Sequence, residues 1–319
     1  MQSLLVIKPS SLGDIVHALQ VVQTFARERP GCRISWVVRE RFAGLVQAAP
    51  FVHETIIFRR RDGGKAFLRL LRELRARRFD AVWDMQGLLR SGLMTAAARA
   101  PAKWGRADAR EGAGFFYNRR IERPAGPGPH HALDILQQFL RTDGVAPRLD
   151  FPLTLNDGPA PAWQAFFARD RDPTKNFVIF TDSRGAEKEW LRFNELTALI
   201  FKSIPDCRVA WCAGKATKPE IAMPPGSFLN LTGCPLDEMI ALVRQPAVFI
   251  GNDSGPMHLS AASGNRVLAI FGPTSPQRFG PYPLSAPKHL AVEAPGGQLD
   301  RLNAAVVFAA LQELRARVL

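Results

Sequence analysis

Residues 4–22 read LLVIKPSSLGDIVHALQVV and contain the pattern that decides the fold. Four apolar residues in a row, Leu4 to Ile7, predict a strand that is buried on both faces. A short turn with two serines follows, and the spacing of Ile15 and Leu19 then predicts an amphipathic helix. The order strand, turn, helix is typical of a parallel sheet that is covered by helices.

This alternation continues through the chain and occurs twice. The predicted strands are Leu4–Lys8, Ile34–Val38, Thr55–Phe58 and Ala81–Met85 in the first half, then Phe177–Phe180, Val209–Cys212, Phe228–Leu231, Val248–Ile250 and Val267–Phe271. Residues 143–161, between the halves, are rich in Gly and Pro and predict a linker. The predicted fold is α/β, with two Rossmann-like domains that face each other across a cleft. We assign residues 1–150 to an acceptor-binding domain and 151–319 to a nucleotide-sugar-binding domain. The last helix of the chain is a candidate to pack back on the first domain.

The chain has 319 residues, enough for two domains of about 150 residues each. Its 46% hydrophobic and 22% charged residues are typical of a globular protein and exclude a disordered chain. The four cysteines lack CxxC spacing, which favours buried, reduced thiols. The apolar stretch Ala304 to Leu311 is too short to cross a bilayer, and no secretory signal is visible. We therefore expect a cytoplasmic protein.

The net charge of +13 belongs almost wholly to the first half. Residues 1–150 hold 25 Lys and Arg against 14 Asp and Glu, whereas residues 151–319 hold 17 against 15. Arginine accounts for 22 of the 25, and its planar guanidinium suits phosphate and carboxylate groups. Two clusters stand out, namely Arg59, Arg60 and Arg61 after a predicted strand, and Arg119 with Arg120. A solvated surface, a nucleic-acid groove and an acidic lipid surface are all compatible with this charge.

The turn after the first strand places Asp14 in the first turn of a helix. It matches neither GxGxxG nor GxxxxGK[ST], so the dinucleotide fingerprint and the P-loop are absent from this turn. A carboxylate at this position can cap the helix, where it is favoured by about 0.3–1 kcal/mol. It can also serve as a general base, because such sheets bind ligands beyond the carboxyl ends of their strands. The residues alone leave both interpretations open.

The segment GNDSGPMH, residues 251–258, is the sharpest signal in the second half. It follows a predicted strand, Asp253 and Ser254 can cap a helix, and Pro256 suits a first turn. Free backbone N–H groups there favour a phosphate. Gly272 in the next strand–turn unit offers a second small-residue approach, although ordinary turn chemistry explains both loops as well. We favour binding of a diphosphate.

A third segment, residues 181–190, follows another predicted strand, and Ser183 and Lys188 in it could meet a nucleotide phosphate. No HxH, HExxH or Cys/His set is present, so a metal site is not expected.

With these segments the chain resembles the bacterial lipopolysaccharide heptosyltransferases of glycosyltransferase family 9, most closely the heptosyltransferase I group. The similarity spans the chain in order, through residues 4–22, RRFDAVWDMQGLLRSGLMTAAARA (77–100), AREGAGFFYNRRI (109–121), HHALD (130–134) and GNDSGPMHLSAASGNRVLAIFGPTSP (251–276).

The resemblance implies a GT-B fold and an inverting, metal-independent transfer without a cofactor. The implied donor is ADP-L-glycero-D-manno-heptose, and the acceptor is a Kdo sugar of the lipid A-linked inner core. Asp14 matches the catalytic base, and Lys188 matches the lysine that holds the donor phosphates. The expected donor-binding residues are Ser183, Lys188, Asp253, Ser254, Gly255, His258 and Gly272; the expected acceptor-binding residues are Ser11, Gly13, Arg59, Arg60, Arg61, Arg119 and Arg120. The family's ribose-contacting acid has no counterpart at residues 212–217, which hold no carboxylate.

Two other functions stay open from the sequence. A transferase of the same fold could use another nucleotide sugar or acceptor, as a heptosyltransferase II or a protein glycosyltransferase does. A sequence pI of about 10.3 also fits a nucleic-acid-binding protein, but no RRM, KH or helix-turn-helix signature is present and we expect no nucleic-acid partner. The expected partners are a nucleotide sugar, the acidic Kdo–lipid A acceptor and anionic lipid at the inner face of the inner membrane, where we expect peripheral attachment.

Overall fold

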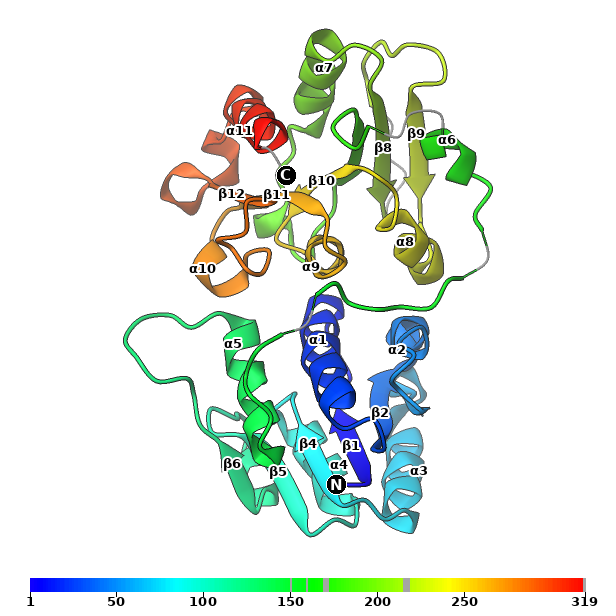
Figure 1. The fold of residues 1–319 in the computed structure, drawn as a ribbon, viewed down its shortest axis with the longest axis vertical. Helices are drawn as coiled ribbons and strands as arrows, with labels where there is room; N and C mark the ends of the chain where they lie inside the picture. Colours follow the sequence, from blue (N-terminus) through cyan, green and yellow to red (C-terminus); the bar gives the residue numbers. More distant parts are fainter. Residues whose placement is uncertain (150, 159, 169–171, 215–218, 318–319) are drawn as a thin grey trace. The chain divides into compact units, whose positions relative to one another are not determined.

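The computed structural model describes residues 1–149, 151–158, 160–168, 172–214 and 219–317 (Figure 1). The chain divides into two compact units, Met1–Asn156 and Asp157–Leu319. Each unit is built on one six-stranded parallel sheet, so the α/β class with two parallel sheets is confirmed.

The sheet of the first unit has the strand order β3-β2-β1-β4-β5-β6. Its strands are β1 (Ser3–Ile7), β2 (Arg33–Arg39), β3 (Glu54–Phe58), β4 (Ala81–Asp84), β5 (Ala102–Arg106) and β6 (Arg119–Ile121). The helical segments are α1 (Leu12–Glu28), η1 (Glu40–Phe42), α2 (Ala43–Gln47), η2 (Arg60–Asp62), α3 (Gly63–Ala76), α4 (Leu89–Ala97), η3 (Ala113–Phe116), α5 (Ala132–Gln137) and η4 (Gln138–Asp143).

Helices cover both faces of this first sheet. On one face, Leu70 of α3 and Met94 of α4 pack in one cluster with Leu5 and Ile7 of β1. On the other face, the Trp83 ring lies 4.9 Å from Phe25 of α1 and 5.6 Å from Phe139 of η4, centroid to centroid. Burial on both faces explains why β1 is an uninterrupted apolar run.

The sheet of the second unit has the strand order β12-β11-β10-β7-β8-β9. Its strands are β7 (Asn176–Phe180), β8 (Arg208–Ala213), β9 (Phe228–Thr232), β10 (Val248–Asn252), β11 (Arg266–Phe271) and β12 (His289–Glu293). The helical segments are α6 (Gln164–Ala168), η5 (Ala186–Lys188), α7 (Phe193–Ser203), α8 (Leu236–Leu242), α9 (Gly255–Ala262), α10 (Pro276–Phe279), η6 (Pro295–Gly297), η7 (Leu299–Arg301) and α11 (Ala304–Ala316).

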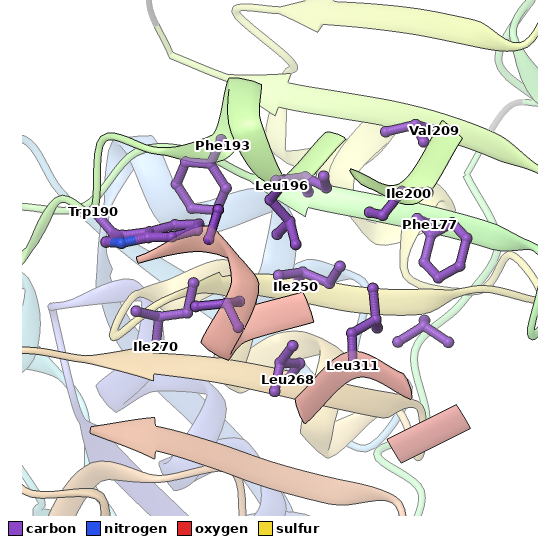
Figure 2. Close-up of a cluster of buried hydrophobic side chains, with 14 of the residues drawn as sticks. Phe177, Trp190, Phe193, Leu196, Ile200, Val209, Ile250, Leu268, Ile270 and Leu311 are labelled. Carbon is purple, nitrogen blue, oxygen red and sulfur yellow. The ribbon is translucent and has the colours of Figure 1, made fainter. Parts of the chain in front are cut away.

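A cluster of buried hydrophobic side chains in the second unit joins its sheet to α7 and α11, as Figure 2 shows. Phe193, Leu196 and Ile200 come from α7, and Leu311 comes from α11. The last helix α11 thus takes its burial from its own unit, where it packs against α7, β11 and β12.

Three strands lack a sequence prediction, namely β5, β6 and β12. Only one of the five residues of β5 is buried, and β6 is three residues long with two exposed arginines. In β12 only His289 is buried. The sequences of β5 and β6 therefore lack the apolar run by which the others were predicted, whereas β12 has a short one, Leu290 to Val292, that the sequence prediction missed. Among the described residues, no helix is long and apolar enough to span a membrane.

Candidate active site

Lys8 follows β1 directly and is buried at the carboxyl end of the first sheet. Its backbone carbonyl accepts a hydrogen bond from Nε1 of Trp36 at 3.3 Å. Its ammonium lies 3.4 Å from Oδ1 of Asp14, and only 2% of its side-chain surface is exposed. Burial lowers the pKa of Lys8, and the nearby Arg106 adds to this, whereas Asp14 opposes it. An ammonium so deep in a protein needs a counterion, and Asp14 supplies it.

Asp14 is held at the N-terminus of α1 by the turn that precedes it. Its Oδ2 accepts hydrogen bonds from the backbone N–H of Ser11 at 3.1 Å and from the Ser11 hydroxyl at 2.6 Å. Burial would raise the pKa of Asp14, but Lys8 and the two Ser11 hydrogen bonds hold it well below its usual value. With 46% of its side-chain surface exposed, the carboxylate still reaches solvent. Capping and a role as a base are therefore compatible in one residue.

A second carboxylate, Asp84, lies at the end of β4, next to β1 in the sheet. It is fully buried and accepts hydrogen bonds from the Tyr117 hydroxyl at 2.8 Å and from the N–H groups of Gln86 and Gly87 at 3.0 Å. Burial raises the pKa of Asp84. The sequence prediction did not single out Lys8 or Asp84, which interact electrostatically, although each is a polar residue at the end of an apolar strand.

The two arginine clusters lie at opposite edges of the first sheet. Arg59 and Arg60 follow β3, and Arg119 and Arg120 form part of β6. All are exposed; Arg59 pairs with Glu40 at 3.3 Å, and Arg119 lies over the Trp104 ring at 5.3 Å. The strands β3 and β6 are the first and last of the strand order, so the clusters flank β1 instead of forming one patch.

In the second unit Asp253 collects donors from three loops. Its Oδ2 is 2.6 Å from the Lys188 ammonium after β7 and accepts a hydrogen bond from the Thr274 hydroxyl after β11 at 2.8 Å. Its Oδ1 lies 3.7 Å from Nε2 of His258, and its backbone carbonyl accepts a hydrogen bond from the Ser183 hydroxyl at 3.0 Å. Burial opposes ionisation, but His258 and Lys188 hold the pKa of Asp253 well below its usual value.

This cluster lies at the N-terminus of α9, because Ser254 is its N-cap and Gly255 its first residue. The Ser254 hydroxyl is buried and has no hydrogen-bond partner among the described atoms. The first N–H groups of a helix lack intrahelical acceptors, so this end favours an anion. A lysine ammonium beside it strengthens that preference. The predicted donor-binding residues Ser183, Lys188, Asp253 and His258 are thus brought together at one sheet edge by two segments, the one after β7 and the one after β10.

Two residues fix the shape of this edge: Asn252, which the sequence prediction missed, and Gly272, which it named as donor-binding. Asn252, fully buried, accepts a hydrogen bond from the backbone N–H of Trp190 at 3.1 Å and donates to the carbonyl of Thr181 at 2.9 Å. These two hydrogen bonds therefore connect the loop that carries Lys188 to the end of β10. Close packing favours glycine at position 272, because a Cβ there would lie 2.7 Å from the Leu299 side chain.

The neighbouring loop after β8 is described as far as Gly214. Its N–H donates to Oδ2 of Asp182 at 2.5 Å, so a carboxylate from the end of β7 reaches the end of β8. Residues 215–217, at which the family's ribose-contacting acid would fall, lie outside the described residues. Among the described residues, no three His, Cys, Asp or Glu side chains gather as metal ligands.

The model of the family described as glycosyltransferase family 9 (heptosyltransferase) matches residues 67–298. The chain belongs to glycosyltransferase family 9. The family membership expected from the sequence is thereby confirmed, and the protein is a glycosyltransferase.

Relatives in family 9 match along most of their length. The lipopolysaccharide core heptosyltransferase OpsX of Haemophilus influenzae is 28% identical, over 88% of this chain and 82% of that protein. Lipopolysaccharide heptosyltransferase 1 of Pseudomonas aeruginosa is 31% identical, over 87% of this chain and 81% of that protein. The solved structure of the E. coli heptosyltransferase WaaC with ADP superposes with a TM-score of 0.77 at 24% identity, over 98% of this chain and 99% of that one. That likeness confirms the GT-B fold class.

Proposed function

We propose that this family 9 enzyme transfers L-glycero-D-manno-heptose from ADP-heptose to a Kdo sugar of the lipopolysaccharide inner core, with inversion. The observation that carries the proposal is the contact of Lys188 with Asp253 beside the N-terminus of α9. It supports a site for the diphosphate of a nucleotide sugar. The relatives named as lipopolysaccharide heptosyltransferases support the sugar and its destination.

In this mechanism Asp14 is the general base. The acceptor hydroxyl oxygen bonds to the anomeric carbon from the face opposite the nucleotide, and the hydroxyl proton passes to Asp14. The bond between the anomeric carbon and the phosphate oxygen breaks, and ADP leaves with its electrons. Lys188 and the N–H groups of α9 then stabilise the charge that develops on the diphosphate, and such preorganised donors contribute about 3–4 kcal/mol each.

The low pKa of Asp14 sets the timing of the proton transfer. A carboxylate beside the Lys8 ammonium is a weak base toward a neutral hydroxyl. The hydroxyl becomes acidic only as its oxygen bonds to the anomeric carbon. The proton therefore moves late, when a carboxylate of low pKa is sufficient. We propose no metal ion and no cofactor for this step.

For the acceptor we propose Ser11, Gly13 and the arginine clusters, since lipid A and Kdo carry phosphates and carboxylates. Arginine binds both groups through two parallel hydrogen bonds. The charge excess of residues 1–150 also supports peripheral attachment to anionic lipid at the inner face of the inner membrane, at about 1 kcal/mol for each well-placed basic residue.

The direct test is transfer with defined substrates. Purified protein is incubated with Kdo–lipid A and either ADP-heptose, ADP-glucose or a UDP-sugar, and the acceptor is analysed by mass spectrometry. We expect the acceptor to gain one heptose from ADP-heptose alone. A thermal-shift series with the same donors gives a second readout, because a ligand raises the melting temperature by mass action. Transfer from a UDP-sugar but not from ADP-heptose would overturn the assignment of the donor.

A further inference from the structure

The described residues include five large hydrophobic side chains that are exposed, and three of them belong to the first unit. These three are Leu68 of α3, Leu89 of α4 and Phe115 of η3, with exposed fractions of 54%, 42% and 92%. The other two, Leu191 and Val306, belong to the second unit. A phenylalanine that is 92% exposed buries almost none of its ring in its own chain, so its role has to be sought outside the fold.

The three segments that carry these side chains form one layer. The helix α3 packs against α4, and α4 packs against η3. The approach of η3 is close, because a Cβ on Gly92 of α4 would lie 2.6 Å from the Phe116 ring. Leu70 and Met94 of this layer face the sheet core. We call the outward side of α3, α4 and η3, with Leu68, Leu89 and Phe115, the outer helical face.

Basic residues surround the exposed leucine of α3. Lys65, Arg72 and Arg75 are spaced −3, +4 and +7 from Leu68, so they share its side of the helix, and all are exposed. In residues 59–75 the exposed basic side chains are Arg59, Arg60, Arg61, Lys65, Arg69, Arg72 and Arg75, whereas the exposed acids are Asp62 and Glu73. Glu73 is itself paired with Arg77 at 2.7 Å. Near Leu89 the exposed Glu111 accepts a hydrogen bond from the Leu89 backbone N–H at 3.2 Å. It is the one exposed acid in residues 89–120, in which the exposed basic side chains are Arg90, Arg99, Arg110, Arg119 and Arg120. The segments of the outer helical face therefore combine exposed apolar side chains with excess positive charge.

We propose that the outer helical face binds the surface of an anionic bilayer and inserts Phe115, Leu68 and Leu89 among the lipids. Basic side chains that ring apolar ones fit a membrane interface, where the former meet anionic headgroups and the latter enter the acyl boundary. A second copy of this chain would bring the same positive charge to the contact, and like charges oppose that pairing. This inference rests on the proposed function in one respect, because that function identifies the membrane as the inner face of the inner membrane.

The test measures partition of the full-length protein onto vesicles that contain neither donor nor acceptor. The vesicles are made of phosphatidylglycerol and phosphatidylcholine in equal parts, or of phosphatidylcholine alone. Phe115→Ser and Leu68→Ser are compared with Leu191→Ser, a matched control because Leu191 is 83% exposed in the second unit. All three sites are on the surface, so the variants are expected to fold, and thermal melting checks this.

We expect Phe115→Ser to weaken partition onto the anionic vesicles by about tenfold, because burial of a phenylalanine contributes about that factor or more. Leu68→Ser should weaken it less, and Leu191→Ser should leave it unchanged. High salt should weaken binding without abolishing it, since salt screens the charges but not the apolar insertion. In Phe115→Trp, brominated lipids should quench the fluorescence more than in the parent protein.

Equal binding of Phe115→Ser and the parent protein would overturn the proposal, as would an equal loss in Leu191→Ser. A dimer that Phe115→Ser dissociates, seen by light scattering, would assign the face to a second copy instead. Because the vesicles contain no substrate, failure of this proposal and failure of the transfer assay remain distinguishable.

Discussion

The ammonium of Lys8 lies 3.4 Å from Oδ1 of Asp14, and the two side chains differ sharply in exposure, at 2% and 46%. Lys8 depends on Asp14 for its counterion, whereas Asp14 also has water and two hydrogen bonds from Ser11. The pair is therefore asymmetric, so replacing Lys8 and replacing Asp14 should change the free energy of unfolding by different amounts.

Replacement of the base tests its chemical role. Asp14→Asn should lower kcat by about 10²–10⁴-fold, the usual contribution of a general base, and leave the Kd for ADP nearly unchanged. Steady-state kinetics and calorimetry measure the two quantities. Glu28→Gln is the control, because Glu28 is an acid at the other end of the same helix. Near-normal turnover in Asp14→Asn would remove Asp14 from the role.

The asymmetry of the pair predicts a difference in stability. Asp14→Asn removes the carboxylate that lies 3.4 Å from a buried ammonium and leaves Lys8 only its electrostatic interaction with Asp84, so it should lower the free energy of unfolding by about 1–3 kcal/mol. Lys8→Met should cost less, because Asp14 keeps its solvent and its Ser11 donors. The double variant should regain part of the loss of Asp14→Asn. Denaturant melts check this, and an equal cost of the two single variants would contradict it.

The phosphate role of Lys188 predicts a loss of donor affinity. Lys188→Met should weaken ADP binding by about 10–100-fold, because a hydrogen bond to a charged group contributes about 1.5–3 kcal/mol. It also leaves Asp253 near the diphosphate without its cation. The control is Lys202→Met, an exposed lysine on α7 of the same unit. Unchanged ADP affinity in Lys188→Met would move the phosphate site elsewhere.

The buried side chain of His289 should make the free energy of unfolding depend on pH. Its Nδ1 lies 2.8 Å from the carbonyl of Pro283, and its buried Nε2 has no partner among the described atoms. Burial lowers the pKa of His289 from 6.5 to about 4. Between these values the unfolded chain binds more protons than the native one, so stability falls as the pH falls, by about 2 kcal/mol at pH 5. At higher pH the histidine is neutral in both states and this contribution vanishes.

His289→Asn can keep the donor to Pro283 and removes the titrating nitrogen. Denaturant melts of this variant between pH 7 and 5 should lose less stability on acidification than the parent does. His130→Gln, a histidine of the loop before α5, is the control. A pH slope in His289→Asn as steep as in the parent would contradict the prediction.

Some strands could be predicted from the sequence because burial on both faces leaves an apolar run, as in β1 and β7. Strands with exposed residues, such as β6 with its two arginines, leave no such run.

The candidate site could likewise be predicted only in part. Asp14 and the 251–258 loop are visible because strand-to-helix turns have recognisable residues. The contact of Lys188 with Asp253 spans 65 residues and depends on which strands are neighbours. The burial of Lys8 could not be predicted either, since lysine is rarely buried.

The placement of the arginine clusters on β3 and β6 limits the shape of what can touch both. Five inter-strand steps separate these edges, about 24 Å at about 4.8 Å a step. Even with long side chains that lean inward, a compact monosaccharide can reach one cluster only. A molecule that engages both must be elongated, with anionic groups at its two ends. The two arginine clusters would then select a polyanion by its length as well as by its charge.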